Sequence, residues 1–151
     1  MARASVKVLN LSKGRREIER AVEKATMKAM KFAMKDLERV ASETAPLDEG
    51  DLEMGGVHDV DTTSKGLKGW VWFEAWNDNP DRSYDFNYAV WTHEQTYNLG
   101  PKSKKKGSGS GLSGKTYPVG NKYLTRPLEG ESPFYRDKIE EEVKESLKRL
   151  G

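Results

Sequence analysis

The fold is set by one long stretch, residues 14–44, which reads GRREIERAVEKATMKAMKFAMKDLERVASET. Its apolar side chains recur at steps of three and four residues, and strong helix formers such as Ala, Lys and Glu stand between them. That spacing places the apolar side chains on one face of a helix, and Pro46 marks its end. A helix of this length spans about 45 Å. We therefore predict a long N-terminal helix that offers more surface than one small core covers.

A second apolar stripe, formed by Met27, Met30 and Met34, runs beside the first at the same helical spacing. It has two interpretations. The stripe can simply widen the core-facing side of the helix, or its flexible methionine side chains can pack against a neighbouring subunit. Neither interpretation requires a cofactor.

The segments 52–61 and 67–76 have the composition of two strands joined by a polar turn at 62–66. Three tryptophans, Trp70, Trp72 and Trp76, alternate there with smaller or polar residues, as is typical of strands. We predict a β-hairpin.

A third strand is predicted over residues 86–93, which would direct Trp91 toward solvent or a partner. The residues between the hairpin and this strand, 77–85, are rich in Asn, Asp and Pro, which favours an exposed loop.

Residues 99–118 change character, with a lysine run followed by glycine and serine. This composition predicts a flexible basic loop. After it, Pro133 suits the first turn of a closing helix. The expected fold is a single α+β domain over residues 1–151, in which a long N-terminal helix and a C-terminal helix pack on an antiparallel sheet, with the long basic loop inserted.

Gly109, Gly114, Lys115 and Thr116 match the phosphate-binding pattern G-x-x-x-x-G-K-T. That chemistry needs a strand before the loop and a helix after it, whereas a lysine-serine run precedes it and Pro118 follows. We interpret the match as accidental and expect no nucleotide or other cofactor.

No catalytic or metal-binding group is predicted. The sequence has no cysteine, and neither of its two histidines has a second ligand at a zinc-like spacing. His93 and Glu94, as neighbours in the predicted strand, would point to opposite faces and could not share a proton. We expect that the protein is not an enzyme.

Net charge and hydrophobic content argue against two further classes of protein, dedicated nucleic-acid binders and proteins with membrane-spanning helices. The 151 residues carry a net charge of only +2, which is far from the basicity of a dedicated nucleic-acid binder. With 35% hydrophobic and 33% charged residues and no long apolar run, we expect no membrane-spanning helix. A local alternative stays open, in which the lysines at Lys102–Lys106 contact nucleic-acid phosphates.

Three short motifs occur in a characteristic order: APLDEGDL at residues 45–52, YAVWTHE at 88–94 and YLTRPL at 123–128. In this order the chain resembles the tail-completion, or head-to-tail joining, proteins of tailed bacteriophages. Members of that family typically have an A-P-V-D-T-G-x-L stretch after the first helix, a Y-A-x-x-x-E or Y-A-x-x-x-H-E strand, and a short F-L or Y-L element before the last helix. Glu49 departs from this pattern, because the family usually has Thr there, and the basic Gly/Ser insert is longer than expected.

The resemblance implies a structural protein of the virion neck, made in the host cytoplasm. It would form a ring, usually sixfold, that contacts the head connector and the tail tube or terminator proteins, and it would have no catalytic residues. Packaged DNA is a further possible contact. The residues that we expect to contact neighbouring subunits or partners are Met27, Met30, Met34, Trp91, Lys102, Lys104, Lys105 and Lys106.

Overall fold

A computed structural model describes residues 11–47, 50–76 and 86–151, so the loop expected at 77–85 lies outside the described residues. The chain is an α+β protein, as predicted. Its elements, in order, are α1 (Leu11–Thr44), α2 (Asp51–Met54), β1 (Gly56–Thr63), β2 (Gly66–Phe73), α3 (Tyr88–Glu94), α4 (Pro101–Lys105), β3 (Gly109–Ser110), β4 (Thr116–Tyr117) and α5 (Thr125–Lys148).

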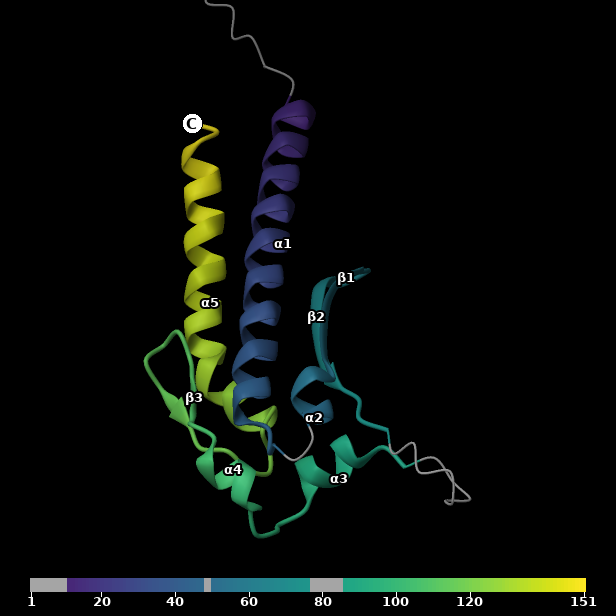
Figure 1. Cartoon of the computed structure of the whole chain (residues 1–151). Helices are drawn as coiled ribbons and strands as arrows, with labels where there is room; N and C mark the ends of the chain where they lie inside the picture. Colours follow the sequence, from purple (N-terminus) through teal and green to yellow (C-terminus); the bar gives the residue numbers. More distant parts are fainter. Residues whose placement is uncertain (1–10, 48–49, 77–85) are drawn as a thin grey trace, which may run out of the picture.

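Helix α1 is the axis of the molecule (Figure 1). Helix α5 runs antiparallel along one side of it, the β1–β2 hairpin lies on another side, and the short elements α3 and α4 gather near its C-terminal end. The C-terminal helix packs mainly on α1, and it also meets the sheet where Val71 of β2 packs against the cluster that contains Tyr135.

Small side chains on α1 allow α5 to approach closely. Ala25, Ala29 and Ala33 are buried, and Ala33 packs with Leu37 and with Tyr135 of α5. Toward the far ends of the two helices, the Ser146 hydroxyl donates to the Ala21 carbonyl. The pairing thus extends along most of α1, which explains why this helix can exceed the length of a compact core.

The β1–β2 hairpin is antiparallel, with Gly56 opposite Phe73 and Thr63 opposite Gly66. It confirms the predicted hairpin, with strands that begin and end within a few residues of the expected bounds. Val60 and Phe73 point inward and are buried, whereas the alternate positions are exposed, as the two-residue period of a strand requires.

The main core lies at the base of the molecule. There Phe73 and Tyr123 meet edge to face with ring centroids 5.3 Å apart, an arrangement worth about 0.5–1.5 kcal/mol beyond the area buried. The residues of this core come from the end of α1, from α2, β2 and α3, and from the segments beside them: Ala41, Ala45, Leu52, Phe73, Ala75, Ala89 and Tyr123.

The prediction of a third strand was wrong, because residues 88–94 form helix α3. Ala89 and Thr92 are both buried, a spacing that suits one face of a helix. The Asn87 side chain caps the helix by accepting a hydrogen bond from the Ala89 amide at 3.1 Å. The main sheet is therefore two-stranded.

The closing helix also differs from its prediction, since α5 begins eight residues before Pro133. A proline inside a helix removes one backbone hydrogen bond and clashes with the carbonyl four residues earlier, which bends the helix. Figure 1 shows the first turns of α5 running at an angle to the rest. Across the described parts of the chain, no helix has the length and apolarity needed to cross a membrane.

Candidate interaction surfaces

The outer side of the hairpin is the first surface, here called the tryptophan face and defined by Val57, Asp59, Asp61, Trp70 and Trp72. Strand pairing sets Val57 opposite Trp72 and Asp59 opposite Trp70. Val57, Trp70 and Trp72 are 43%, 42% and 41% exposed. Aromatic side chains of this kind dominate the energetics of protein interfaces.

The hairpin has two apolar sides, and α1 covers only one of them. Gly69 lies against Met34 so closely that a Cβ atom there would clash with the Met34 sulfur. Met30 also lies beside Gly69. These two methionines therefore hold the inner side of the hairpin, and the tryptophan face on the other side is left uncovered by the described residues.

The second surface is a groove of about 530 Å³ at the base of the molecule, here called the base groove. It lies between the end of α1, helix α3 and the start of α4, and its apolar walls include Leu47, Trp91, Tyr97, Leu99 and Pro101.

Trp91 forms one wall of the base groove and is 48% exposed. Its ring stacks on Tyr97 with centroids 5.4 Å apart and planes at 18°. The Tyr97 hydroxyl donates to the Thr92 carbonyl at 2.7 Å, and burial raises the pKa of Tyr97 to about 12, so it stays protonated at neutral pH. The stacked pair is therefore a fixed apolar wall.

The predicted basic loop is not devoid of structure. Residues 99–118 contain α4 and the two-residue pairing of β3 with β4. Lys102, Lys104 and Lys105 are exposed on α4, and Lys102 lines the base groove.

Lys106 turns inward instead. Its ammonium donates to the carbonyls of Ser42 at 2.7 Å and Ala45 at 2.8 Å, and lies 3.3 Å from the Glu53 carboxylate. A cation at this position satisfies orphan carbonyls and complements the negative end of the helix dipole. Lys106 therefore caps α1 within the chain.

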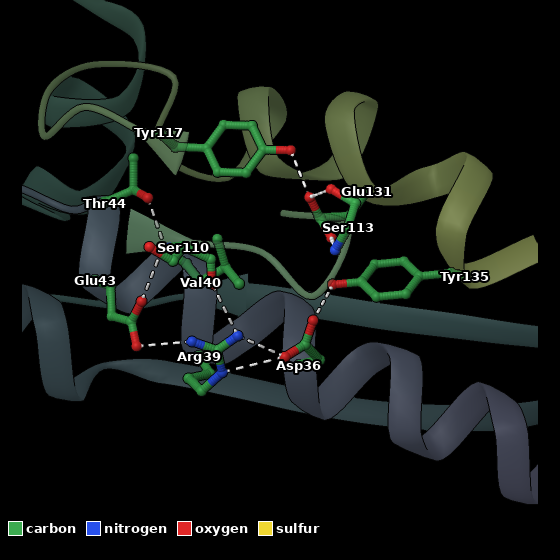
Figure 2. Close-up of polar contacts among 10 residues, drawn as sticks. All are labelled: Asp36, Arg39, Val40, Glu43, Thr44, Ser110, Ser113, Tyr117, Glu131 and Tyr135. Atoms are coloured by element: carbon green, nitrogen blue, oxygen red, sulfur yellow. Dashed lines mark hydrogen bonds and ion pairs between the residues drawn. The ribbon is translucent and has the colours of Figure 1, made fainter. Parts of the chain in front are cut away.

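Two polar clusters fasten the segment 109–117 to the helices (Figure 2). In the first, the Glu131 carboxylate accepts hydrogen bonds from the Ser113 amide at 3.0 Å, the Ser113 hydroxyl at 2.6 Å and the Tyr117 hydroxyl at 2.7 Å. Glu131 is completely buried. Burial raises the pKa of Glu131, but these hydrogen bonds together with Lys115 outweigh that effect and hold the pKa below its ordinary value.

The second cluster joins α1 to β3. Arg39 forms ion pairs with Asp36 at 2.7 Å and with Glu43 at 2.8 Å, and it donates to the Ser110 carbonyl at 3.0 Å. The Ser110 amide in turn donates to Glu43 at 3.2 Å. Segment 109–117 is thus anchored through both its backbone and its side chains.

The glycines of the segment 109–117, which include Gly109 and Gly114 of the phosphate-binding pattern, have structural roles. A Cβ at Gly109 would lie 2.5 Å from the Thr44 hydroxyl, and one at Gly111 would clash with the Glu131 carboxylate. Gly114 has a φ of +89°, as its turn requires. The Lys115 ammonium donates to the Gly130 carbonyl at 2.9 Å. Packing or backbone conformation therefore accounts for each of these glycines, and Lys115 has a hydrogen-bond partner within the chain.

The prediction that the His93 and Glu94 side chains point to opposite faces was wrong, because residues 88–94 form a helix and not a strand. In α3 the two side chains are 2.7 Å apart. Glu94 also pairs with Lys122, whose hydrogen bond, together with that from His93, lowers the pKa of Glu94. His93 contacts the Thr125 hydroxyl at 3.1 Å and stands edge to face on Tyr123. This group joins α3 to the start of α5.

The structure places the residues expected to be contacts in three groups. Met30 and Met34 pack beneath the hairpin of their own chain, and Met27 is half-buried on α1. Trp91, Lys102, Lys104 and Lys105 lie exposed at or near the base groove. Lys106 is an internal cap.

The contact residues predicted from the sequence include neither the tryptophan face nor Tyr97. The signal for the face was available in the sequence, because Trp70 and Trp72 alternate with Val71 and Phe73. Such a strand is apolar on both sides, and a two-stranded hairpin packed on one helix can bury only one of them.

Comparison of the chain with protein-family models, curated proteins and solved structures found no match.

Proposed function

We propose that this chain is a structural subunit of the neck of a tailed bacteriophage, a tail-completion protein that forms a ring between the head connector and the tail. Its contribution is made through docking surfaces, and no chemical step is assigned to it. The tryptophan face carries the proposal: exposed tryptophans grouped on one side of a sheet are characteristic of an interface.

The positions of the three motifs support the same proposal. In the first motif, Ala45 is buried at the end of α1 and Gly50 has a φ of +99° at the start of α2. The second motif forms α3, and its Ala89 carbonyl accepts a hydrogen bond from Tyr123 of the third motif at 3.0 Å. The motifs therefore meet at the base of the molecule, next to the base groove, where they fix the frame that presents it.

The alternative, a nucleic-acid-binding module, rests on Lys102, Lys104 and Lys105, because Lys106 is used as a cap. Three phosphate contacts predict a slope of roughly −3 for log affinity against log salt. A slope near zero, or binding unchanged in Lys104→Gln/Lys105→Gln, counts against this alternative.

The decisive test is removal of the gene from the phage that carries it, followed by electron microscopy of the lysate. We expect DNA-filled heads and complete tails that are not joined. Wild-type protein supplied from a plasmid restores joining, whereas Trp72→Asp does not, because a charge replaces an apolar contact at the interface. The matched control is Lys148→Asp, an exposed change at the end of α5 that should restore joining. Joined, infectious particles without the gene would contradict the proposal.

A further inference from the structure

We propose that the tryptophan face of one copy docks into the base groove of a second copy of the same chain, so that successive subunits join head to tail. The inference rests on the proposed function and names the contact between neighbouring subunits.

The tryptophan face projects from the molecule. Its inner side is held on α1 by Met30 and Met34, so the outer side is directed away from α1. Trp70 and Trp72 occupy alternate positions of one strand and therefore stand side by side. The Lys68 ammonium lies 3.8 Å from the Trp70 ring centroid and covers part of that ring. No such cation contact is present at Trp72 among the described residues, so its ring is more accessible to a partner. A ridge of this kind fits a concave apolar site.

The base groove is concave and apolar, and its wall is already ordered. The stacking of Trp91 on Tyr97 and the hydrogen bond from Tyr97 to Thr92 fix the aromatic wall before any partner arrives. A preorganised wall lowers the entropic cost of docking. At about 530 Å³ the groove has room for large aromatic side chains.

The net charges of the two surfaces are opposite, although Lys68 also lies on the outer side of the hairpin, opposite Asp61. Asp59 and Asp61 lie on the tryptophan face, whereas Lys104 and Lys105 follow the groove-lining Lys102 on α4. Within the described ranges, none of Asp59, Asp61, Lys104 and Lys105 forms an ion pair. Opposite charges around an apolar contact steer association and fix its register.

The complementarity identifies the partner as a second copy. A single chain carries both surfaces at different places, and its own hairpin is fastened with the tryptophan face turned away from α1. Docking between copies therefore uses two different patches and leaves one of each patch free at the ends. Such heterologous contacts propagate and close into a ring when the rotation between subunits permits.

The chain contains no cysteine, so a thiol-specific cross-linker will react only at cysteines that are introduced. We would prepare the full chain as Asp59→Cys, as Lys104→Cys and as the double variant, and treat each with a short bismaleimide cross-linker. The two single variants mixed together should give a covalent heterodimer and nothing larger, and each alone should stay monomeric. The double variant should give a ladder of oligomers.

Two controls make the test specific. Lys144→Cys, an exposed position on α5, should not cross-link to Asp59→Cys. Adding Trp72→Ala to the Asp59→Cys chain should lower the heterodimer yield about tenfold, as the loss of an interface hot spot does. Trp76→Ala, which removes an exposed tryptophan outside the strand pair, should leave the yield unchanged.

The inference is overturned if Asp59→Cys cross-links to itself, or if the mixture cross-links no more than the Lys144→Cys control does. The same cysteines introduced into assembled particles separate the two proposals. If the protein is found in the neck but residues 59 and 104 do not cross-link, only the proposed contact is refuted. If they cross-link but the protein is absent from the neck, only the proposed function is refuted.

Discussion

The Tyr135 hydroxyl donates a 2.8 Å hydrogen bond to the Asp36 carboxylate inside the α1–α5 interface, although 99 positions separate the two residues. Burial and the adjacent carboxylate raise the pKa of Tyr135 well above its ordinary value, so the hydroxyl keeps its proton. Asp36 also accepts from Arg39, which reaches Ser110. One carboxylate therefore links the helix pair to the segment 109–117.

This link can be measured with a double-mutant cycle of Tyr135→Phe and Asp36→Asn. We expect each change to lower the free energy of unfolding by about 1–3 kcal/mol, because each leaves a buried polar group with fewer partners. The double variant should lose less than the sum, with a coupling above about 0.5 kcal/mol. Urea denaturation gives the values, and Asp36→Asn combined with Lys148→Gln should be additive. Additivity in the first pair would mean that the hydrogen bond contributes nothing.

Gly111→Ala tests whether the glycines of the basic segment serve packing. A Cβ at Gly111 would clash with the Glu131 carboxylate, and we expect a loss of about 1–3 kcal/mol from overpacking. Gly107→Ala is the matched control, since a Cβ there meets nothing within 4 Å. Thermal denaturation of both variants decides the matter. Equal melting temperatures would show that the segment behaves as a plain linker.

Acid should loosen the segment 109–117 through Glu131. Its pKa is below the ordinary value of 4.5 in the folded protein. The carboxylate therefore stabilises the fold above its unfolded-state pKa, and this stability is lost as the pH falls through the lower, folded-state pKa. Between about pH 6 and pH 3, the wild type should lose more stability than Glu131→Gln, which has no carboxylate to titrate. Parallel pH profiles of the two proteins would refute this expectation.

Met34→Glu should loosen the hairpin. The sequence-based hypothesis gives Met30 and Met34 to a neighbouring subunit, and on that basis their replacement leaves a folded monomer. The packing of Met34 against Gly69 leads instead to a destabilised chain, with a loss of about 1–3 kcal/mol and altered tryptophan fluorescence. Met54→Glu is the control, because Met54 is 78% exposed and should change stability by less than about 0.5 kcal/mol. An unchanged melting temperature for Met34→Glu would instead support the hypothesis that the methionines contact a neighbouring subunit.

Helical periodicity and turn chemistry were sufficient to predict α1 and the hairpin. The 34 residues of α1 end at Thr44 as expected, before Pro46, and the turn between β1 and β2 falls within the predicted polar stretch. Gly50 adopts a positive φ between α1 and α2, which a glycine allows without strain. These features depend on local spacing and backbone freedom, which a single sequence displays.

The errors arose where local preference and packing disagree. Residues 88–94 are rich in Tyr, Val, Trp and Thr, which favour strands, but the Asn87 cap and the buried pair Ala89 and Thr92 make them a helix. In the segment 99–118, Pro101 at the first turn of α4 was a helix signal that the lysine and glycine content obscured. The partners of Gly109 and Gly111 lie on α1 and α5, and no local pattern announces contacts so distant in sequence.

The end of α1 is capped by residues that lie far along the chain, so its last turn forms late in folding. Its last carbonyls are satisfied by Lys106, more than sixty residues later, and by the Gly120 amide, which donates to Thr44. Closing such long loops costs entropy before the contacts form, which slows the step. During synthesis on the ribosome, most of α1 can coil as soon as it emerges, whereas its final turn waits for a segment made much later. We therefore expect the base, with its groove, to be the last part of the subunit to mature.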